Sequence, residues 1–432
     1  MPHRRRRPEH TGRVERLVIR PTGPLSGTVP IGGAKNSVLK LMAATLLAEG
    51  TFVLRNVPDI TDVACMADVL RAMGITVDRS GAGEVTIVRP ATDDVVTEAP
   101  YELVERMRAS TAVLGPLVAR FGRARVALPG GDDFGSRPID LHTRALQRLG
   151  ATVEIRHGYI EASADRLVGA RIELEFPSVG ATENALMAAV LAKGTTVIDN
   201  AAREPEIADL ARFLNRMGAK VLGAGSPTIR VEGADELSPV EHAVIPDRIE
   251  AATYLAAVAV AGGEITLTGA QPDHLTMLVH KLGEMGMRIA PEGDGLWASA
   301  PRRLRAADVV TLPYPGVATD VKPLLLAVLS VADGVGIVSE NIFSGRFRYV
   351  DELRRMGADI TVEGHHAVVR GQACLSGAPV RAHDIRAGAA LAVAALRAEG
   401  ETVIGDAQHI ARGYERFDAK LRALGADVVA EG

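Results

Sequence analysis

The chain has 432 residues, of which 47% are apolar, 24% are charged and 3% are aromatic, and its formal net charge is −4. This composition is typical of a globular protein, and at roughly 150 residues per domain the length predicts two or three domains. It excludes disordered, collagen-like and disulfide-scaffold chains, and the charge and scarce aromatic residues argue against a nucleic-acid-binding protein.

The first segment is basic, with four consecutive arginines at residues 4–7. No apolar run follows, so it does not resemble a secretory signal, and we expect residues 1–15 to form a disordered tail. No stretch reaches the roughly 18–20 apolar residues of a membrane span. The two cysteines, Cys65 and Cys374, form no CxxC pair, which predicts a reducing compartment and a cytoplasmic protein.

A helix-end phrase, Leu-x-x-Met/Leu-Gly, recurs six times at intervals of 68 to 76 residues. A short β-like run follows most copies, and an interleaved phrase places an apolar helix, a glycine and a strand in each unit. The copies of the first phrase end at Gly74, Gly150, Gly218, Gly286, Gly357 and Gly425. Each unit of about 70 residues therefore predicts helix, strand, helix and strands, which is an α/β pattern. Six such units are too few and too large for a thin solenoid, so we expect two lobes of three units.

Two polar, turn-rich segments interrupt the units, at residues 32–36 and 245–248. If both are crossovers, one lobe covers residues 35–245 and the other combines residues 1–34 with 246–432. A ligand is then expected in the cleft between the lobes.

Two of the loops before apolar helices could bind an anion. In Gly32-Gly33-Ala34-Lys35-Asn36, the free N–H groups of a helix N-terminus and the charge of Lys35 suit an anion. The alternative is a simple glycine turn capped by Asn36 or Ser37. The segment 178–184 has the same design and the same two interpretations.

The long loop 128–138 contains three glycines and two prolines, and we expect a mobile lid there. One carboxylate of the Asp132-Asp133 pair could donate a proton; the alternative is an exposed acidic turn. Asp320 is either a general base or the N-cap of a helix over 321–331. Four arginines are either surface residues or, if they converge on one cleft, a clamp for a polyanion: Arg108, Arg346, Arg386 and Arg412. The sequence has no metal-ligand spacing and no GxSxG motif.

Seven motifs together resemble the UDP-N-acetylglucosamine 1-carboxyvinyltransferase family of enolpyruvyl transferases, over about residues 16–430. They are GGAKNS at 32–37, MRAS at 107–110, LPGGDDFGSRPIDLH at 128–142, FPSVGATEN at 176–184, NAAREPEI at 200–207, PDRIEA at 246–251 and RGYER at 412–416. The resemblance implies an inside-out α/β barrel of two lobes, each of three βαβαββ repeats. It also implies a metal-independent, monomeric enzyme with no cofactor. That enzyme would transfer the enolpyruvyl group of phosphoenolpyruvate to the 3′-hydroxyl of UDP-N-acetylglucosamine through a tetrahedral ketal, releasing phosphate, at the start of peptidoglycan precursor synthesis.

The resemblance also assigns roles to individual residues. Asp132 takes the proton-donor position, where many members of the family have cysteine, so the chain is expected to be insensitive to fosfomycin. Asp320 would accept the proton of the attacking hydroxyl, and Lys35 and Arg412 would act at the reacting centre. The implied substrate contacts are Lys35, Asn36, Arg108, Arg137, Pro138, Ile139, Asp140, Leu141, Phe176, Pro177, Ser178, Val179, Asp320, Ile342, Arg346, Arg386 and Arg412.

The chain departs from the family pattern around the expected acceptor and phosphoenolpyruvate pocket. The departures are Val317, Ala318, Lys322, Ser344, Gly345 and Ala411. They motivate an alternative function, a paralogous enolpyruvyl transferase of nucleoside-antibiotic synthesis acting on UMP or another uridine nucleotide. A second alternative is a non-catalytic sensor of UDP-sugars.

Overall fold

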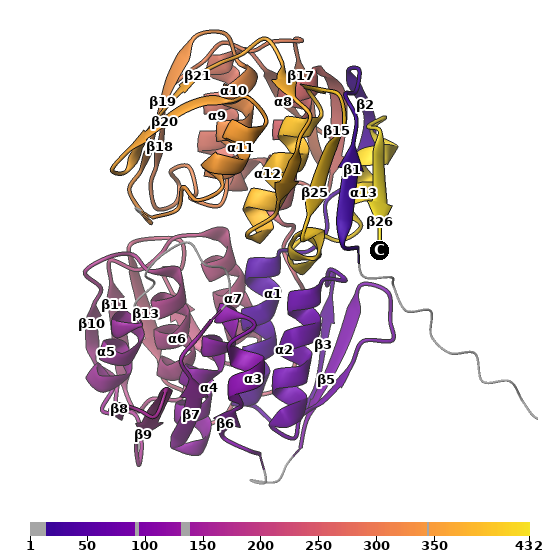
Figure 1. Cartoon of the computed structure of the whole chain (residues 1–432). Helices are drawn as coiled ribbons and strands as arrows, with labels where there is room; N and C mark the ends of the chain where they lie inside the picture. Colours follow the sequence, from indigo (N-terminus) through magenta and orange to yellow (C-terminus); the bar gives the residue numbers. More distant parts are fainter. Residues whose placement is uncertain (1–13, 91–94, 131–138, 344) are drawn as a thin grey trace, which may run out of the picture.

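The computed structural model describes residues 14–90, 95–130, 139–343 and 345–432. Figure 1 shows two lobes, one above the other, with both described ends of the chain in the upper lobe. Each lobe is built from four-stranded sheets that surround helices.

The lower lobe contains three four-stranded sheets of identical topology in the described residues. In each, the first two strands are parallel and the other neighbours are antiparallel. The strand orders are β14 (Glu241–Ala243), β3 (Gly50–Arg55), β5 (Glu84–Arg89) and β4 (Thr76–Asp78); β6 (Glu98–Ala99), β7 (Arg123–Ala127), β9 (Tyr159–Ser163) and β8 (Thr152–Arg156); and β10 (Arg171–Glu173), β11 (Thr195–Asp199), β13 (Thr228–Glu232) and β12 (Lys220–Leu222).

The upper lobe repeats this topology three times. Its strand orders are β2 (Leu25–Pro30), β15 (Gly263–Thr268), β17 (Gly295–Ala300) and β16 (Arg288–Glu292); β18 (Val309–Thr311), β19 (Val335–Glu340), β21 (His366–Arg370) and β20 (Asp359–Glu363); and β23 (Pro379–Arg381), β25 (Thr402–Gly405), β1 (Arg16–Ile19) and β26 (Val428–Glu431). The short strands β22 (Leu375–Ser376) and β24 (Ala398–Glu399) pair separately.

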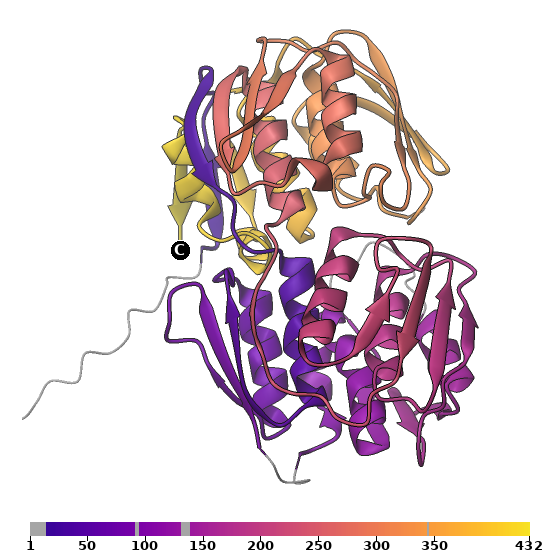
Figure 2. The same cartoon turned by 180° about the vertical axis from the view of Figure 1, so that it is seen from behind.

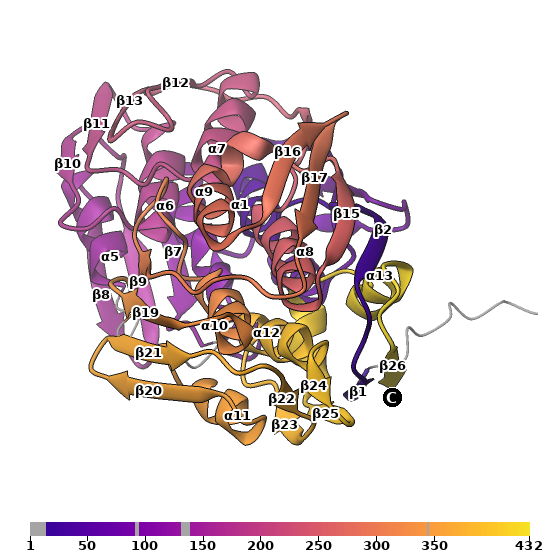
Figure 3. The ribbon, with the colours of Figure 1, turned by 90° about the horizontal axis from the view of Figure 1, so that it is seen from above.

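Six inner helices form the centres of the lobes: α1 (Lys35–Ala44), α4 (Leu114–Phe121), α6 (Val179–Ala189), α8 (Arg248–Ala261), α10 (Lys322–Val331) and α12 (Ile385–Ala395). Their sequences are apolar on nearly every side, which requires burial. All residues of α10 and α12 are buried. Figure 3 shows the sheets of the upper lobe around α8, α10 and α12. The predicted inside-out α/β fold is thus confirmed.

The remaining helices expose one side: α2 (Thr61–Ala72), α5 (Asp140–Arg148), α7 (Pro205–Arg216), α9 (Thr276–Met285), α11 (Val350–Arg355) and α13 (Phe417–Ala423). Shorter turns are α3 (Tyr101–Val104) and the 3-10 helices η1 (Thr45–Leu47), η2 (Arg108–Val113), η3 (Pro272–His274) and η4 (Ala407–Arg412). All six helices with an exposed side end beside the recurring glycines of the sequence. Helix α9 ends directly before Gly286, and each of the other five ends two residues before its glycine, with one turn residue between them.

The chain passes between the lobes twice, and the two crossovers pair with each other. Ala34 N donates to Ile245 O at 2.7 Å, and Asp247 N donates to Gly32 O at 2.8 Å. Figure 2, the view from behind, shows these segments running between the lobes. Consequently β2 leads from the upper lobe into α1, and β14 leads from the lower lobe into α8.

Buried apolar residues fall into two clusters. One contains residues from Ala34 to Val244, and the other contains Leu17 to Ile31 together with Ile249 to Val428. The cluster changes between Ile31 and Ala34 and again between Val244 and Ile249, beside the two crossovers. We therefore propose lobe boundaries there, at residues 34/35 and 245/246.

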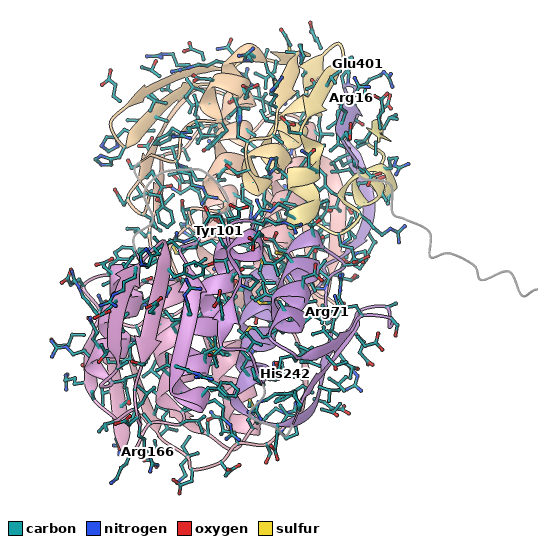
Figure 4. All side chains as sticks on the ribbon, turned by 60° about the horizontal axis from the view of Figure 1, so that its bottom comes forward. Arg16, Arg71, Tyr101, Arg166, His242 and Glu401 are labelled. Atoms are coloured by element: carbon teal, nitrogen blue, oxygen red, sulfur yellow. The ribbon has the colours of Figure 1, made fainter. Side chains whose placement is uncertain are left out.

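Charged side chains cover the outside of both lobes. Figure 4 labels Arg16 and Glu401 on the upper lobe and Arg166 on the lower lobe. Arg16 pairs with Glu431 at 3.1 Å and Arg166 with Asp235 at 3.3 Å, but exposed pairs contribute little to stability. Among the described helices, none is long and apolar enough to cross a membrane.

Candidate active site

A cavity of about 570 Å³ lies between the lobes and is lined by residues of both. Inner helices from all six repeats begin at or beside it. Their contributions are Lys35 of α1, Arg108 of η2 (which leads into α4), Val179 of α6, Arg248 of α8, Asp320 just before α10, and Arg386 of α12. Helix N-termini carry partial positive charge and free N–H groups, so the cavity suits an anionic ligand.

One side of the cavity contains a carboxylate shared between two cations. Asp62, in the first turn of α2, lies 2.9 Å from Lys35 Nζ and 3.0 Å from Arg412 Nε. Burial acts to raise the pKa of Asp62, but the attraction of Lys35 and Arg412 outweighs it, and the pKa lies below its usual value. Because Lys35 and Asp62 come from the lower lobe and Arg412 from the upper, this group joins the lobes.

The opposite group lies wholly in the upper lobe. Asp320 Oδ1 accepts a hydrogen bond from Arg346 Nη1 at 2.7 Å, and Oδ2 lies 3.5 Å from Arg386 Nε. Burial acts to raise the pKa of Asp320, but Arg346 and Arg386 lower it far below the usual range. Asp320 is therefore ionised in this arrangement and can accept a proton only after its contacts with the arginines weaken.

Backbone contacts hold these groups in place. Asp247 caps α8 through the N–H groups of Ile249 and Glu250, and its second oxygen accepts from Lys35 N at 3.0 Å. The carboxylate of Asp384 caps α12 in the same way, accepting from Arg386 N and Ala387 N. Both caps fix the helix ends from which the cationic side chains project.

The lower-lobe wall carries a second set of polar groups. Lys40 Nζ lies 3.2 Å from Glu183 and donates to Asn36 O at 3.0 Å. Burial raises the pKa of Glu183 to about 7. His142 contacts Asn184 through Nδ1 at 3.0 Å, and burial lowers the pKa of His142 to about 4, so it is neutral at pH 7.

A further ion pair joins the first turn of α7 to the first residue of α8. Arg248 Nε donates to Glu206 at 3.0 Å, and the guanidinium lies 5.6 Å from the ring centroid of Tyr314. Burial raises the pKa of the neighbouring Glu204, which accepts a long 3.5 Å bond from Tyr314 N.

Comparison with known proteins identifies the family. The family model described as EPSP synthase (3-phosphoshikimate 1-carboxyvinyltransferase) matches residues 19–421. The chain belongs to this enolpyruvyl transferase family. It is similar to a UDP-N-acetylglucosamine 1-carboxyvinyltransferase of Mycolicibacterium paratuberculosis, with 53% identity covering 96% of this chain and 99% of the relative. The corresponding protein of Myxococcus xanthus is 50% identical over 97% of this chain and 100% of its own length.

Two solved structures share the enolpyruvyl transferase fold. The enolpyruvyl transferase NikO from Streptomyces tendae superposes with a TM-score of 0.85 at 28% identity, covering 96% of this chain and 99% of NikO. EPSP synthase from Acinetobacter baumannii has a TM-score of 0.74 at 19% identity, covering 97% and 100% of the two chains, which supports the fold alone.

The structure brings most of the predicted site residues of this enolpyruvyl transferase to one cavity. Those that line it are Lys35, Asn36, Arg108, Asp140, Leu141, Phe176, Pro177, Ser178, Val179, Asp320, Ile342, Arg346, Arg386 and Arg412. Ile139 is not among the lining residues and packs against the lower-lobe core instead. Asp132, Arg137 and Pro138 lie outside the described residues.

The structure also tests the alternative interpretation of several of these residues as helix caps. Neither Asn36 nor Ser37 caps α1, whose N-cap is Ala34, and Asp320 does not cap α10, whose N-cap is Val321. Ser37 is instead a buried donor to Asp209 at 2.6 Å. Ser178 does cap α6, accepting from Ala181 N at 3.3 Å, so the capping interpretation holds there.

The sequence analysis missed Asp62 and Lys40. Glu183, Glu204, Glu206 and Arg248 stand in motifs that it recognised, but it assigned them no role. The repeat pattern could have found Arg248, because it starts an inner helix just as Lys35 does. Asp62 offered no such signal, since it stands on α2, whose sequence is that of an ordinary amphipathic helix.

Proposed function

We propose that this enzyme transfers the enolpyruvyl group of phosphoenolpyruvate to the 3′-hydroxyl of UDP-N-acetylglucosamine with release of phosphate, the first committed step of peptidoglycan precursor synthesis. The observation that carries the proposal is the identity of 50–53% over nearly the whole chain with relatives of that name. The cationic cavity between the lobes supports it.

Phosphoenolpyruvate carries a carboxylate and a phosphate on neighbouring atoms, and the cavity offers guanidinium groups from two directions. Arg346 and Arg386 approach from one side, and Arg412 with Lys35 from the other. Guanidinium groups bind carboxylate and phosphate bidentately. We assign these four side chains to the phosphoenolpyruvate end of the site.

Transfer requires a proton at C3 of phosphoenolpyruvate and the loss of a proton from the 3′-hydroxyl. Asp132, outside the described residues, is the proposed proton donor, and Asp320 is the proposed acceptor. The hydroxyl oxygen adds to C2 to give a tetrahedral ketal. Phosphate then leaves C2 while C3 loses a proton, which restores the double bond. When the substrate anion engages Arg346 and Arg386, their hold on Asp320 weakens and its pKa rises toward that of a working base.

The nucleotide sugar is assigned to the lower-lobe wall and the facing loop of the upper lobe. The proposed contacts are Asn36, Arg108, Arg137, Pro138, Asp140, Leu141, Phe176, Pro177, Ser178, Val179 and Ile342.

UMP or another uridine nucleotide is the alternative acceptor. It is favoured by the departures from the family pattern, of which Ala318 lines the cavity. Val317 and Lys322 are buried behind the cavity wall, whereas Gly345 and Ala411 are exposed. NikO, which shares the fold, is also an enolpyruvyl transferase. A non-catalytic UDP-sugar sensor is less well supported, because Lys35, Asp320 and Arg412 are all retained at the cavity.

The test is to incubate the purified protein with phosphoenolpyruvate and either UDP-N-acetylglucosamine or UMP, measuring phosphate release and product mass. Turnover with the nucleotide sugar is the expected result. Turnover with UMP alone would assign the protein to the alternative, and binding of a uridine nucleotide without turnover of either would support the sensor.

We also propose a cytoplasmic, monomeric enzyme that is insensitive to fosfomycin, because a carboxylate at residue 132 lacks the thiolate that such epoxides alkylate. Asp132→Cys is expected to gain time-dependent inactivation by fosfomycin. Inactivation of the unaltered enzyme would contradict the assignment.

A further inference from the structure

We propose that Lys322 and Glu340 form a buried positioning pair that holds the two loops carrying Asp320 and Arg346 at the phosphoenolpyruvate end of the site. The proposal rests on the proposed function, in that it assumes these loops serve phosphoenolpyruvate. Neither residue lines the cavity, so both act through others.

The charged side chain of Lys322 is buried away from solvent. It is the first residue of α10, its side chain is fully buried, and Nζ lies 3.0 Å from Glu340 Oε2. The ammonium also donates to the backbone carbonyl oxygen of Arg346 and lies 3.8 Å from the centroid of the Phe347 ring. One side chain thus connects α10, β19 and the loop that follows β19.

Glu340 is the acceptor for both loops. Its Oε1 accepts from the N–H groups of Ile342 and Phe343 at 2.8 and 3.1 Å, in the loop that leads to Arg346. Its Oε2 accepts from the hydroxyl of Thr319 at 2.7 Å, in the loop that carries Asp320. Thr319 Oγ1 in turn accepts from Arg346 Nη1 at 3.2 Å.

These contacts form a continuous path from the buried pair to the two side chains that face substrate. Lys322 holds the backbone of Arg346, while Glu340 holds Thr319, the neighbour of Asp320. A buried charge that loses its partner is strongly unfavourable, so removing one member forces both loops to rearrange. A shift of about 1 Å at a reacting group can reduce the rate about a hundredfold.

The pair also makes phosphoenolpyruvate binding sensitive to alkaline pH. The charged and titratable groups that face Lys322 are Glu340 on β19, Arg346 and Tyr349 beyond it, and Asp384 at the start of α12. Burial lowers the pKa of Lys322 to about 8, against the opposing attraction of Glu340. Above that pH the ammonium loses its proton and Glu340 its counter-charge, so the loops should loosen.

The experiment compares Lys322→Met and Lys322→Gln in the full-length enzyme, with Val328→Ala as the matched control. Val328 is buried in the same helix but contacts neither loop through a hydrogen bond, so its truncation reports loss of packing alone. The KM for phosphoenolpyruvate, the KM for the uridine nucleotide and kcat are measured from pH 6.5 to 9.5 with whichever nucleotide the unaltered enzyme accepts.

Lys322→Met is expected to raise the KM for phosphoenolpyruvate by about tenfold or more while changing the KM for the nucleotide by less than about threefold. Lys322→Gln keeps an N–H donor for the Arg346 carbonyl but not the charge that faces Glu340. It should therefore raise the KM for phosphoenolpyruvate less than Lys322→Met does, and that KM should no longer rise above about pH 8. Val328→Ala should leave both KM values and the pH profile unchanged.

Equal effects of Lys322→Met on both substrates, or an alkaline rise that persists in Lys322→Gln, would overturn the proposal. If Lys322→Met does not fold, Lys322→Gln decides, through the change in its KM for phosphoenolpyruvate relative to that for the nucleotide together with its pH profile. If the unaltered enzyme turns over with neither nucleotide, the proposed function fails. The affinity for phosphoenolpyruvate, measured by calorimetry across the same pH range, then tests the pair independently.

Discussion

At the residue scale, the site is organised by carboxylates that each hold two cationic side chains. Asp62 joins Lys35 to Arg412, and Asp320 joins Arg346 to Arg386. Such groups keep buried cations in fixed positions before the substrate arrives, so little reorganisation is needed when an anion binds.

Arg386→Lys tests the need for a planar guanidinium in this arrangement. Arg386 is 3% exposed, and its Nη1 makes no hydrogen bond to any described residue, so it is available to an anion. A lysine keeps the charge but loses bidentate geometry, and kcat/KM for phosphoenolpyruvate should fall by about a hundredfold. The control is Arg381→Lys on the exposed face of β23, which should keep full activity; equal activity of both variants would contradict the assignment.

Glu183→Gln tests the buried acid of the lower-lobe wall through the pH dependence of stability. Burial raises the pKa of Glu183 from 4.5 to about 7. Its contribution to stability is therefore present below pH 4.5 and is lost as the pH rises through 7. Between pH 5 and 7.5 this loss is roughly 2 kcal/mol of the free energy of unfolding.

Urea denaturation at the two pH values measures this difference. The Glu183→Gln variant should lack that loss, whereas Glu173→Gln on the exposed face of β10 should behave as the unaltered protein does. A Glu183→Gln variant that loses as much stability as the unaltered protein would show that Glu183 does not titrate in this range.

How far sequence could predict the site depends on the kind of residue. Lys35 stands in a glycine-rich loop, so local pattern alone suggested an anion contact. Arg346 and Arg412 carry no local mark, because an arginine beside a glycine is usually a surface residue, and only the family resemblance selected them. The pairing of Lys40 with Glu183 joins residues 143 positions apart, and no sequence pattern reveals such a contact.

At the element scale, the recurring glycines predicted the helices well because a helix that ends in glycine is a local feature. Local sequence pattern could not predict which strands pair with β1, β2 and β14. β2 and β14 each belong to a sheet whose other strands lie far along the chain, and β1 pairs with β25 and β26 at the opposite end of the sequence. These pairings depend on the whole fold rather than on local pattern.

Gly33→Ala tests the close approach at the first crossover. A Cβ at residue 33 would lie 1.7 Å from the carbonyl oxygen of Asn56, so the backbone would have to move. We expect a loss of about 3 kcal/mol or more in the free energy of unfolding, at the upper end for overpacking. Activity should fall as well, because Lys35 is only two residues away.

The matched control is Gly23→Ala, where a Cβ would meet nothing within 4 Å. Thermal unfolding and phosphate release measured on both variants separate the two sites. Equal midpoints of unfolding would show that the crossover tolerates a side chain.

At the scale of the whole molecule, the site exists only where the lobes meet. The lower lobe supplies Lys35 and Asp62, and the upper lobe supplies Asp320 and Arg412. The paired crossovers bring the first turns of α1 and α8 to the same place, which explains why the polar interruptions of the repeats coincide with the site.

The measurement that tests this account most directly is the rate of phosphate release from phosphoenolpyruvate in the presence of UDP-N-acetylglucosamine. It compares the unaltered enzyme with Lys35→Met from the lower lobe and Arg412→Met from the upper lobe. We predict turnover by the unaltered enzyme and a loss on the order of a thousandfold in each variant, since both cations act in one transition state. Full activity of either variant, or no turnover by the unaltered enzyme with this acceptor, would contradict a single transferase site built from both lobes.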